Sequence, residues 1–237
     1  MLTVESVTSG YGKLQILNDV SIKAEDGKVT VVVGPNGSGK STLLKTIAGL
    51  TTIFQGKVVF EDKTISRLPP HEIARRGLAY LPQTESVFTQ LTVAENIKMA
   101  AYTVAKSDYP DRLKGSLEMF PQIERYMSTK VQSLSGGERQ MVAMAMAMMR
   151  KPKVVMFDEP TANLSPKLAT QVLKTVESLA KDKGLTVILV EQNARKALEM
   201  GSNAYLLVSG RKVYEGSASE LLAHQELAQM YLGLKAA

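Results

Sequence analysis

The chain has 237 residues, of which 29 are basic and 23 acidic, so its formal net charge is +6. Apolar residues make up 44% and charged residues 22%, which is typical of a folded globular protein and excludes wholly disordered and collagen-like classes. The longest apolar run, 141–149, is far shorter than the roughly 20 residues that cross a bilayer, so no membrane-spanning helix is expected. The basic residues are scattered and aromatic residues make up 5%, which argues against nucleic acid as a partner.

Cysteine is absent, so disulfide bonds and thiolate metal sites are excluded. The first residues do not show a basic segment followed by an apolar one, so no secretory signal peptide is predicted. These two features favour a cytoplasmic location.

Strand-like runs rich in Val, Ile and Leu alternate with helical patterns in the first third of the chain. The strands predicted here cover 2–7, 20–24, 29–33 and 57–60. A helix is predicted over 41–50, with an apolar face made of Leu43, Leu44, Ile47 and Leu50.

Strand signals are absent from the middle of the chain. Thr92 and Glu95 form a capping-box pattern that opens a helix through Tyr102. Further helical segments are predicted over 112–127 and 136–150. We therefore expect a helical subdomain, inserted at about 84–150 into an α/β domain.

Strands return in the last third of the chain, over 153–157, 186–190 and a hairpin of 204–208 with 211–214. Ser165 and Pro166 are typical of the N-cap and the first position of a helix. The tail, 218–234, is also predicted to be helical. The whole pattern predicts one α/β domain over 1–237, with antiparallel strands at its front.

The segment GPNGSGKS matches the phosphate-binding pattern G-x-x-x-x-G-K-[ST], and it lies between a predicted strand and a predicted helix. Its glycines let successive backbone N–H groups point at a phosphate, which the positive end of the following helix also faces. Lys40 is expected to reach the β- and γ-phosphates, and the hydroxyl of Ser41 to bind Mg²⁺. The predicted nucleotide-binding residues are Gly34, Pro35, Asn36, Gly37, Ser38, Gly39, Lys40, Ser41 and Thr42.

Asp158 and Glu159 follow four apolar residues, as expected of a buried strand that ends beside the phosphate loop. Asp158 is predicted to bind Mg²⁺ through water, and Glu159 to polarise the attacking water as a general base. The alternative is a strand end with two solvated acids. The phosphate-loop motif in the same chain favours the catalytic interpretation.

Residues 134–140 read LSGGERQ and place two glycines at a helix start, which exposes backbone donors for a second anion. Preceded by the phosphate loop and followed by FDEP, this segment resembles the ATP-binding subunits of ATP-binding-cassette (ABC) transporters over essentially the whole chain. The resemblance implies a P-loop NTPase fold, with a RecA-like core, an antiparallel front sheet and a helical subdomain. It also implies ATP and Mg²⁺ as cofactors and hydrolysis of ATP to ADP and phosphate.

By this resemblance, Tyr11 stacks on adenine, and Gln83 contacts Mg²⁺ and the attacking water. Two cassettes of the family pair head to tail, so Ser135, Gly136 and Gly137 would bind the ATP of the partner. The partners implied are membrane-spanning permease subunits, a second cassette that is identical or different, and indirectly an external solute-binding protein. The resemblance also implies that the chain lies on the cytoplasmic face of the cell membrane. Phe88, Leu91 and Val93 are candidates for the groove that receives a coupling helix of the permease.

Two positions depart from the commonest family pattern. Gln192 stands where many members have a His that contacts the γ-phosphate, and its amide can donate the same hydrogen bond without carrying a charge. Ser165 stands where an Asp is usual. The two histidines, His71 and His224, lie outside the motifs and are expected on the surface.

The segments VEQN and TANLSP resemble one branch of the family, the smaller ATP-binding subunit of branched-chain amino acid importers. The opening MLTVESVTSGYG and residues 230–233 are similar as well. This branch implies an ATPase that powers import of branched-chain or other hydrophobic amino acids, with Glu159, Gln192 and Lys40 as its catalytic residues.

Other functions stay open. The chain could drive transport of another solute, or be a soluble ABC ATPase outside transport. A chromosome-associated ATPase would carry a long coiled coil between residues 40 and 135, and a translation-associated one usually has two cassettes. A regulatory module without turnover is disfavoured by Glu159. The stripe of Met141, Met144 and Met148 is predicted to pack in the core.

Overall fold

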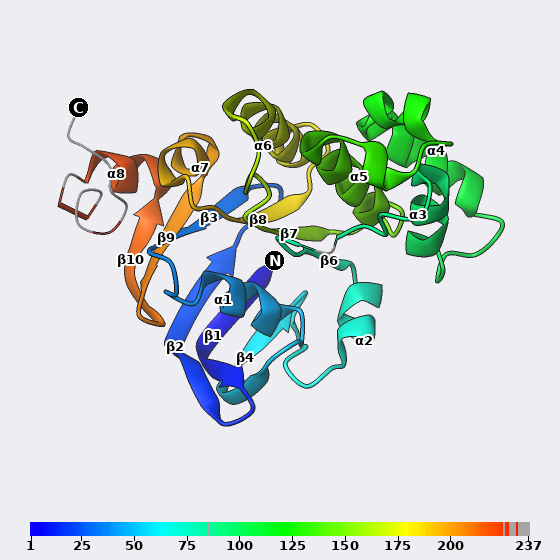
Figure 1. The fold of residues 1–237 in the computed structure, drawn as a ribbon. Helices are drawn as coiled ribbons and strands as arrows, with labels where there is room; N and C mark the ends of the chain where they lie inside the picture. The colour runs from blue at the N-terminus through cyan, green and yellow to red at the C-terminus, as the bar shows by residue number, and fades with distance from the viewer. Residues whose placement is uncertain (85, 225, 228–230, 232–237) are drawn as a thin grey trace.

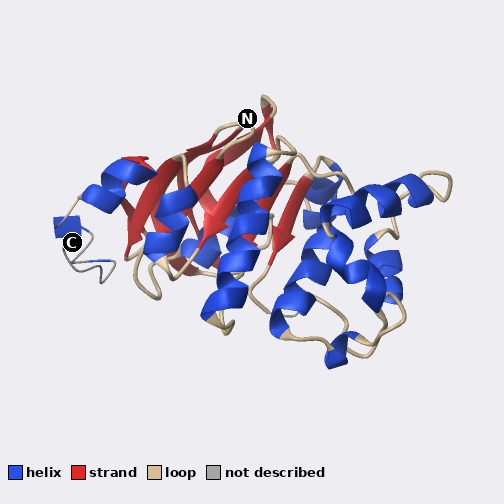
Figure 2. Cartoon of the chain, turned by 90° about the horizontal axis from the view of Figure 1, so that it is seen from above, coloured by secondary structure: helices blue, strands red, loops and turns tan. Residues whose placement is uncertain are grey.

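Two β-sheets with helices around them form the fold in this computed structural model, which describes residues 1–84, 86–224, 226–227 and 231 (Figures 1 and 2). A four-stranded antiparallel sheet has the order β2-β1-β4-β5, and a six-stranded sheet has the order β10-β9-β3-β8-β7-β6. The strands are β1 (Leu2–Tyr11), β2 (Leu14–Ala24), β3 (Val29–Val33), β4 (Thr52–Phe60), β5 (Lys63–Thr64), β6 (Leu78–Leu81), β7 (Val154–Asp158), β8 (Thr186–Val190), β9 (Asn203–Val208) and β10 (Arg211–Ser217).

Helices cover the six-stranded sheet and fill the chain between β6 and β7 (Figure 1). The α-helices are α1 (Lys40–Ile47), α2 (Pro70–Arg75), α3 (Val93–Ala100), α4 (Tyr109–Met119), α5 (Gly136–Met148), α6 (Pro166–Lys181), α7 (Ala194–Met200) and α8 (Ala218–Ala223). Two short 3₁₀ helices, η1 (Pro121–Tyr126) and η2 (Val131–Ser133), precede α5. Within the described residues, no helix is both long and apolar enough to cross a membrane.

The centre of the larger sheet is parallel and wholly buried. Every residue of β3, β7 and β8 is buried, and β8 pairs with both of the others. Parallel strands covered on both faces need apolar side chains in both directions, which explains their near-continuous Val, Ile, Leu and Phe sequences. Helix α1 packs between the two sheets through Leu43, Leu44 and Ile47. The carboxyl ends of β3 and β7 therefore meet at one edge of the sheet.

The predicted strands are all present, but two predictions about where helices end need correction. Helix α1 ends at Ile47, and Gly49 with a φ of +75° turns the chain away, so Leu50 is 49% exposed instead of buried. Helix α3 ends at Ala100, before the expected Tyr102. Ser165 does precede α6, but its side chain makes no capping hydrogen bond.

Other expectations about the helices are confirmed. The capping box of Thr92 and Glu95 opens α3. The side chains of the methionine stripe on α5 are buried: Met141, Met144 and Met148. Both histidines are exposed. The predicted tail helix begins as α8, which ends at Ala223, and residues 225, 228–230 and 232–234 of the predicted range lie outside the described residues.

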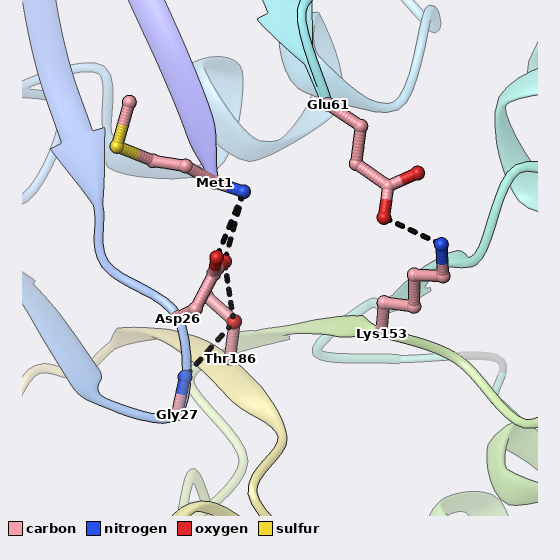
Figure 3. Close-up of polar contacts among 6 residues, drawn as sticks. All are labelled: Met1, Asp26, Gly27, Glu61, Lys153 and Thr186. Carbon is pink, nitrogen blue, oxygen red and sulfur yellow. Dashed lines mark hydrogen bonds and ion pairs between the residues drawn. The ribbon is translucent and has the colours of Figure 1, made fainter.

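Polar contacts join the two sheets at the amino ends of β7 and β8 (Figure 3). The amino group of Met1 lies 2.9 Å from Asp26, whose carboxylate also accepts a hydrogen bond from Thr186 at 3.5 Å. Lys153, just before β7, pairs with Glu61 of the front sheet. Exposed ion pairs of this kind contribute about 1 kcal/mol or less to stability. The apolar layer between the two sheets is therefore the main contact that holds the sheets together.

Candidate functional site

The loop over 34–39 joins the end of β3 to the start of α1, and its shape requires glycine at two positions. A Cβ on Gly34 would lie 2.1 Å from the carbonyl oxygen of Leu207, and one on Gly39 would lie 2.7 Å from a methyl group of Leu17. Gly39 has a φ of +100° and is the N-cap of α1. The loop is thus pressed onto the sheet, and the positive end of α1 faces the same space.

Lys40 lies across this loop. Its side chain is buried, and its Nζ donates hydrogen bonds to the carbonyl oxygens of Gly34 at 2.9 Å and Pro35 at 3.1 Å. Burial lowers the pKa of Lys40, while the carboxylates of Glu159 and Asp158 act in the opposite direction. A cation held between a loop of backbone donors and two carboxylates suits a phosphate ligand with an accompanying metal ion.

Asp158 ends β7 and is nearly fully buried, at 3% exposure. Its Oδ1 accepts a hydrogen bond from the hydroxyl of Ser41 at 2.7 Å, and its Oδ2 accepts one from the hydroxyl of Tyr80 at 2.9 Å. A hydroxyl and a carboxylate oxygen side by side are ligands that Mg²⁺ prefers. No group of three acidic or His side chains that could hold a metal by themselves occurs in the described part of the chain.

Glu159 follows β7 and is positioned by two contacts. Its backbone N–H donates to the carbonyl oxygen of Val190 at 2.9 Å, and its Oε2 accepts from the amide of Gln83 at 3.0 Å. Its backbone φ of +48° lies in a region that residues other than glycine rarely adopt, and residues in that region cluster at functional sites. The hydrogen bond to Val190 therefore fixes the backbone of Glu159, and the hydrogen bond from Gln83 fixes its carboxylate.

Lys40, Ser41 and Glu159 line one open cavity of about 520 Å³, whereas Gly34, Pro35 and Asp158 are not among its lining residues. Its lining brings the phosphate loop together with three side chains from distant segments, Gln83, Glu159 and Gln192. The full lining is Ile16, Asn36, Gly37, Ser38, Gly39, Lys40, Ser41, Thr42, Gln83, Glu159 and Gln192. The cavity thus collects most of the residues predicted for phosphate and metal binding.

Tyr11 and the LSGGE segment do not line this cavity. Tyr11, at the end of β1, is 42% exposed, and the Nζ of Lys45 lies 5.9 Å from the centre of its ring. Ser135 and Gly136 are exposed at the start of α5. A single chain therefore leaves its LSGGE segment open to another molecule.

The start of α5 is nevertheless well ordered by contacts within the chain. The Oε2 of Glu138 accepts from the backbone N–H of Ser135 at 2.8 Å, which completes a capping box. The hydroxyl of Tyr126 donates to the other oxygen of Glu138. This bond, followed by the bond from Ser135, lowers the pKa of Glu138, so its carboxylate stays ionised. A Cβ on Gly137 would lie 3.1 Å from the side chain of Leu168.

Two functional contacts were not predicted from the sequence. Tyr80 reaches Asp158 from β6, a strand that was itself missed. Glu191 is 2% exposed and accepts hydrogen bonds from the backbone N–H groups of Thr161 at 3.0 Å and Gln192 at 3.2 Å. Burial raises the pKa of Glu191, and these hydrogen bonds oppose the rise. A carboxylate directly after a buried apolar strand was the available signal.

One of the three residues predicted for the permease groove is not accessible. Val93 is fully buried as the first residue of α3, so it is not available to a partner, whereas Phe88 is 55% exposed and Leu91 half-buried. An open cavity lies beside Phe88 and Gln83. A separate apolar groove of about 380 Å³ lies beside the edge strand β6, between α2 and α5. Its lining includes Leu50, Ile73, Tyr80, Ala143, Met146 and Ala147.

A phosphate loop after a central parallel strand, with two acidic residues at the end of β7 in the same sheet, defines the class of P-loop NTPases. Residues 17–162 match the ABC transporter family, and the chain belongs to this family.

The chain is 50% identical over 234 residues to a probable branched-chain amino acid transport ATP-binding protein, LivF, of Archaeoglobus fulgidus, with 99% of each covered. It is 38% identical to the high-affinity branched-chain amino acid transport ATP-binding protein BraG of Pseudomonas aeruginosa, over 98% of this chain and all of that one. Two solved structures are similar in fold. The ADP conformation of the ABC transporter cassette MJ1267 has a TM-score of 0.86 at 28% identity, covering 97% of each chain. A dimeric post-hydrolysis state of the cassette MJ0796, bound to ADP and phosphate, has a TM-score of 0.79 at 26% identity, covering 92% of this chain and 99% of that one.

Proposed function

We propose that this chain binds and hydrolyses ATP to power an importer of branched-chain or other hydrophobic amino acids. The observation that carries the proposal is the 50% identity, over nearly the whole length of both chains, to a probable branched-chain amino acid transport ATP-binding protein. Transport of another solute is the alternative, and measurement of solute uptake distinguishes it from amino acid import.

The phosphate loop from Gly34 to Thr42, of which residues 36–42 line the cavity, holds the phosphates through its backbone donors, and Lys40 neutralises their charge. Ser41, Gln83 and Asp158, the last through water, would hold Mg²⁺, which would supply positive charge against the negative charge that develops on the phosphates. Tyr11, exposed at the end of β1, stacks on the adenine.

Glu159 is the general base that takes the proton of the attacking water. Its contact with Gln83 and the backbone bond to Val190 hold the carboxylate at the cavity wall, where a water beside the γ-phosphate can reach it. Gln192 donates a hydrogen bond to the γ-phosphate without taking up a proton. Glu159 and Lys40 are the titratable groups that line the cavity, and of these two Glu159 is the one that takes the proton of the water.

A second cassette completes the site. Ser135, Gly136 and Gly137 lie outside the cavity of their own chain, and Ser135 and Gly136 are exposed, so they can face the ATP of a partner in a head-to-tail pair. A similar cassette is described as dimeric with ADP and phosphate. The partner is a second copy of this chain or a different cassette.

We place the chain on the cytoplasmic face of a membrane as one domain, with a helical subdomain at about 84–150. The apolar groove beside β6 contacts the permease subunits, and an external solute-binding protein acts through them. Nucleic acid has no part in this function.

The test is solute uptake by the assembled transporter. We expect proteoliposomes that contain this chain, its permease subunits and a solute-binding protein to take up labelled leucine when ATP is enclosed on the cassette side. The Glu159→Gln variant should assemble but not transport. ATP hydrolysis that is stimulated by the binding protein with a different solute, and not with leucine, isoleucine or valine, would overturn the amino acid assignment.

A further inference from the structure

The carboxylate of Asp158 is held by a donor on each of its oxygens. Ser41 approaches Oδ1 at 2.7 Å and Tyr80 approaches Oδ2 at 2.9 Å. One donor would leave the carboxylate plane free to rotate about its terminal single bond, whereas two donors from different elements fix both its position and its plane.

The two donors differ in what else they do. The hydroxyl of Ser41 is itself proposed to bind the metal, so its direction changes with the ligands of the site. Tyr80 does not line the phosphate-loop cavity, and its hydroxyl is directed at Oδ2 from the side of β6. Tyr80 therefore holds Asp158 from outside the space that nucleotide would occupy.

Tyr80 is itself rigidly placed. It lies in β6, where it is the register partner of Met156 in β7, and its half-buried ring packs against the apolar layer between the two sheets.

We propose that Tyr80 is a positioning residue of the metal site, whose hydroxyl orients the carboxylate of Asp158 so that Oδ1 faces Ser41. This inference rests on the proposed role of Asp158 in Mg²⁺ binding. Tyr80 also lines the apolar groove beside β6. Tyr80 thus lies between the groove proposed to contact the permease and the Asp158 carboxylate proposed to bind the metal.

The test is Tyr80→Phe, which removes the hydroxyl and keeps the ring. Outer-shell partners of metal ligands typically contribute about 10- to 100-fold in metal affinity or activity. With ADP bound, we expect about 10-fold more Mn²⁺ at half-saturation than in the wild type, measured by electron paramagnetic resonance of free Mn²⁺. ADP affinity without metal should be unchanged. ATP hydrolysis should need a correspondingly higher Mg²⁺ concentration.

Two further variants separate the possible failures. Tyr102→Phe is the matched control, because Tyr102 is 86% exposed, and it should leave Mn²⁺ binding unchanged. Asp158→Asn should weaken Mn²⁺ binding by at least as much as Tyr80→Phe. If Asp158→Asn weakens binding and Tyr80→Phe does not, the positioning role is overturned and the metal site stands. If Asp158→Asn has no effect, the proposed metal site itself is wrong. A lower unfolding temperature of Tyr80→Phe with wild-type Mn²⁺ binding would show a purely structural tyrosine.

Discussion

Replacement of Glu159 by Gln is expected to slow steady-state ATP hydrolysis by a factor on the order of 10² to 10⁴, the usual contribution of a general base. The amide has nearly the shape of the carboxylate and can still contact Gln83, which lies 3.0 Å away, but it cannot take a proton. Phosphate release at saturating Mg-ATP measures the effect, and nucleotide affinity should be close to that of the wild type.

A suitable control for this variant is Glu61→Gln. Glu61 is an exposed acid that pairs with Lys153 at the amino end of β7, whereas the cavity lies at the carboxyl end of this strand. Its replacement should therefore not change hydrolysis. Wild-type turnover in Glu159→Gln would remove Glu159 from the chemistry. Loss of nucleotide binding in the same variant would instead assign it a structural role.

Lys40→Ala is expected to weaken the binding of ATP by about 10²-fold. A hydrogen bond to a charged group contributes about 1.5 kcal/mol or more, so two such bonds to phosphate oxygens amount to about 3 kcal/mol, and each 1.4 kcal/mol is tenfold in affinity. The truncation also leaves the carbonyl oxygens of Gly34 and Pro35 without the donor that they have in the free protein. Isothermal titration with ATP measures the change.

Lys174→Ala, on the exposed surface of α6, removes the same charge far from the loop and serves as the control. It should bind ATP like the wild type. An unchanged affinity in Lys40→Ala would contradict the assignment of the cavity as the phosphate site.

The phosphate loop could be predicted from sequence because its shape is encoded locally. Glycines at fixed spacing, a strand before them and a helix after them are all contiguous, and Gly34 and Gly39 are required by contacts just behind the loop. The buried strand that ends at Asp158 is encoded in the same local way, by a run of apolar residues.

Some contacts between distant segments could not be predicted. Tyr80 and Asp158 are 78 positions apart, and they meet only because β6 lies next to β7 in the sheet. Four residues with two buried positions are too short a pattern to identify β6 as a strand. Leu50 was misplaced because the helical spacing continues past the point where Gly49 turns the chain.

If ATP is bound between two cassettes, the mass of the Glu159→Gln variant in solution, measured by light scattering, should depend on ATP. We expect single chains without nucleotide and a doubled mass with Mg-ATP, because the variant binds ATP but hydrolyses it slowly. Ser135→Arg, added to this variant, should prevent the dimer and leave ATP binding intact. A single-chain mass at saturating Mg-ATP, both alone and mixed with any cassette that co-purifies with this chain, would contradict the account.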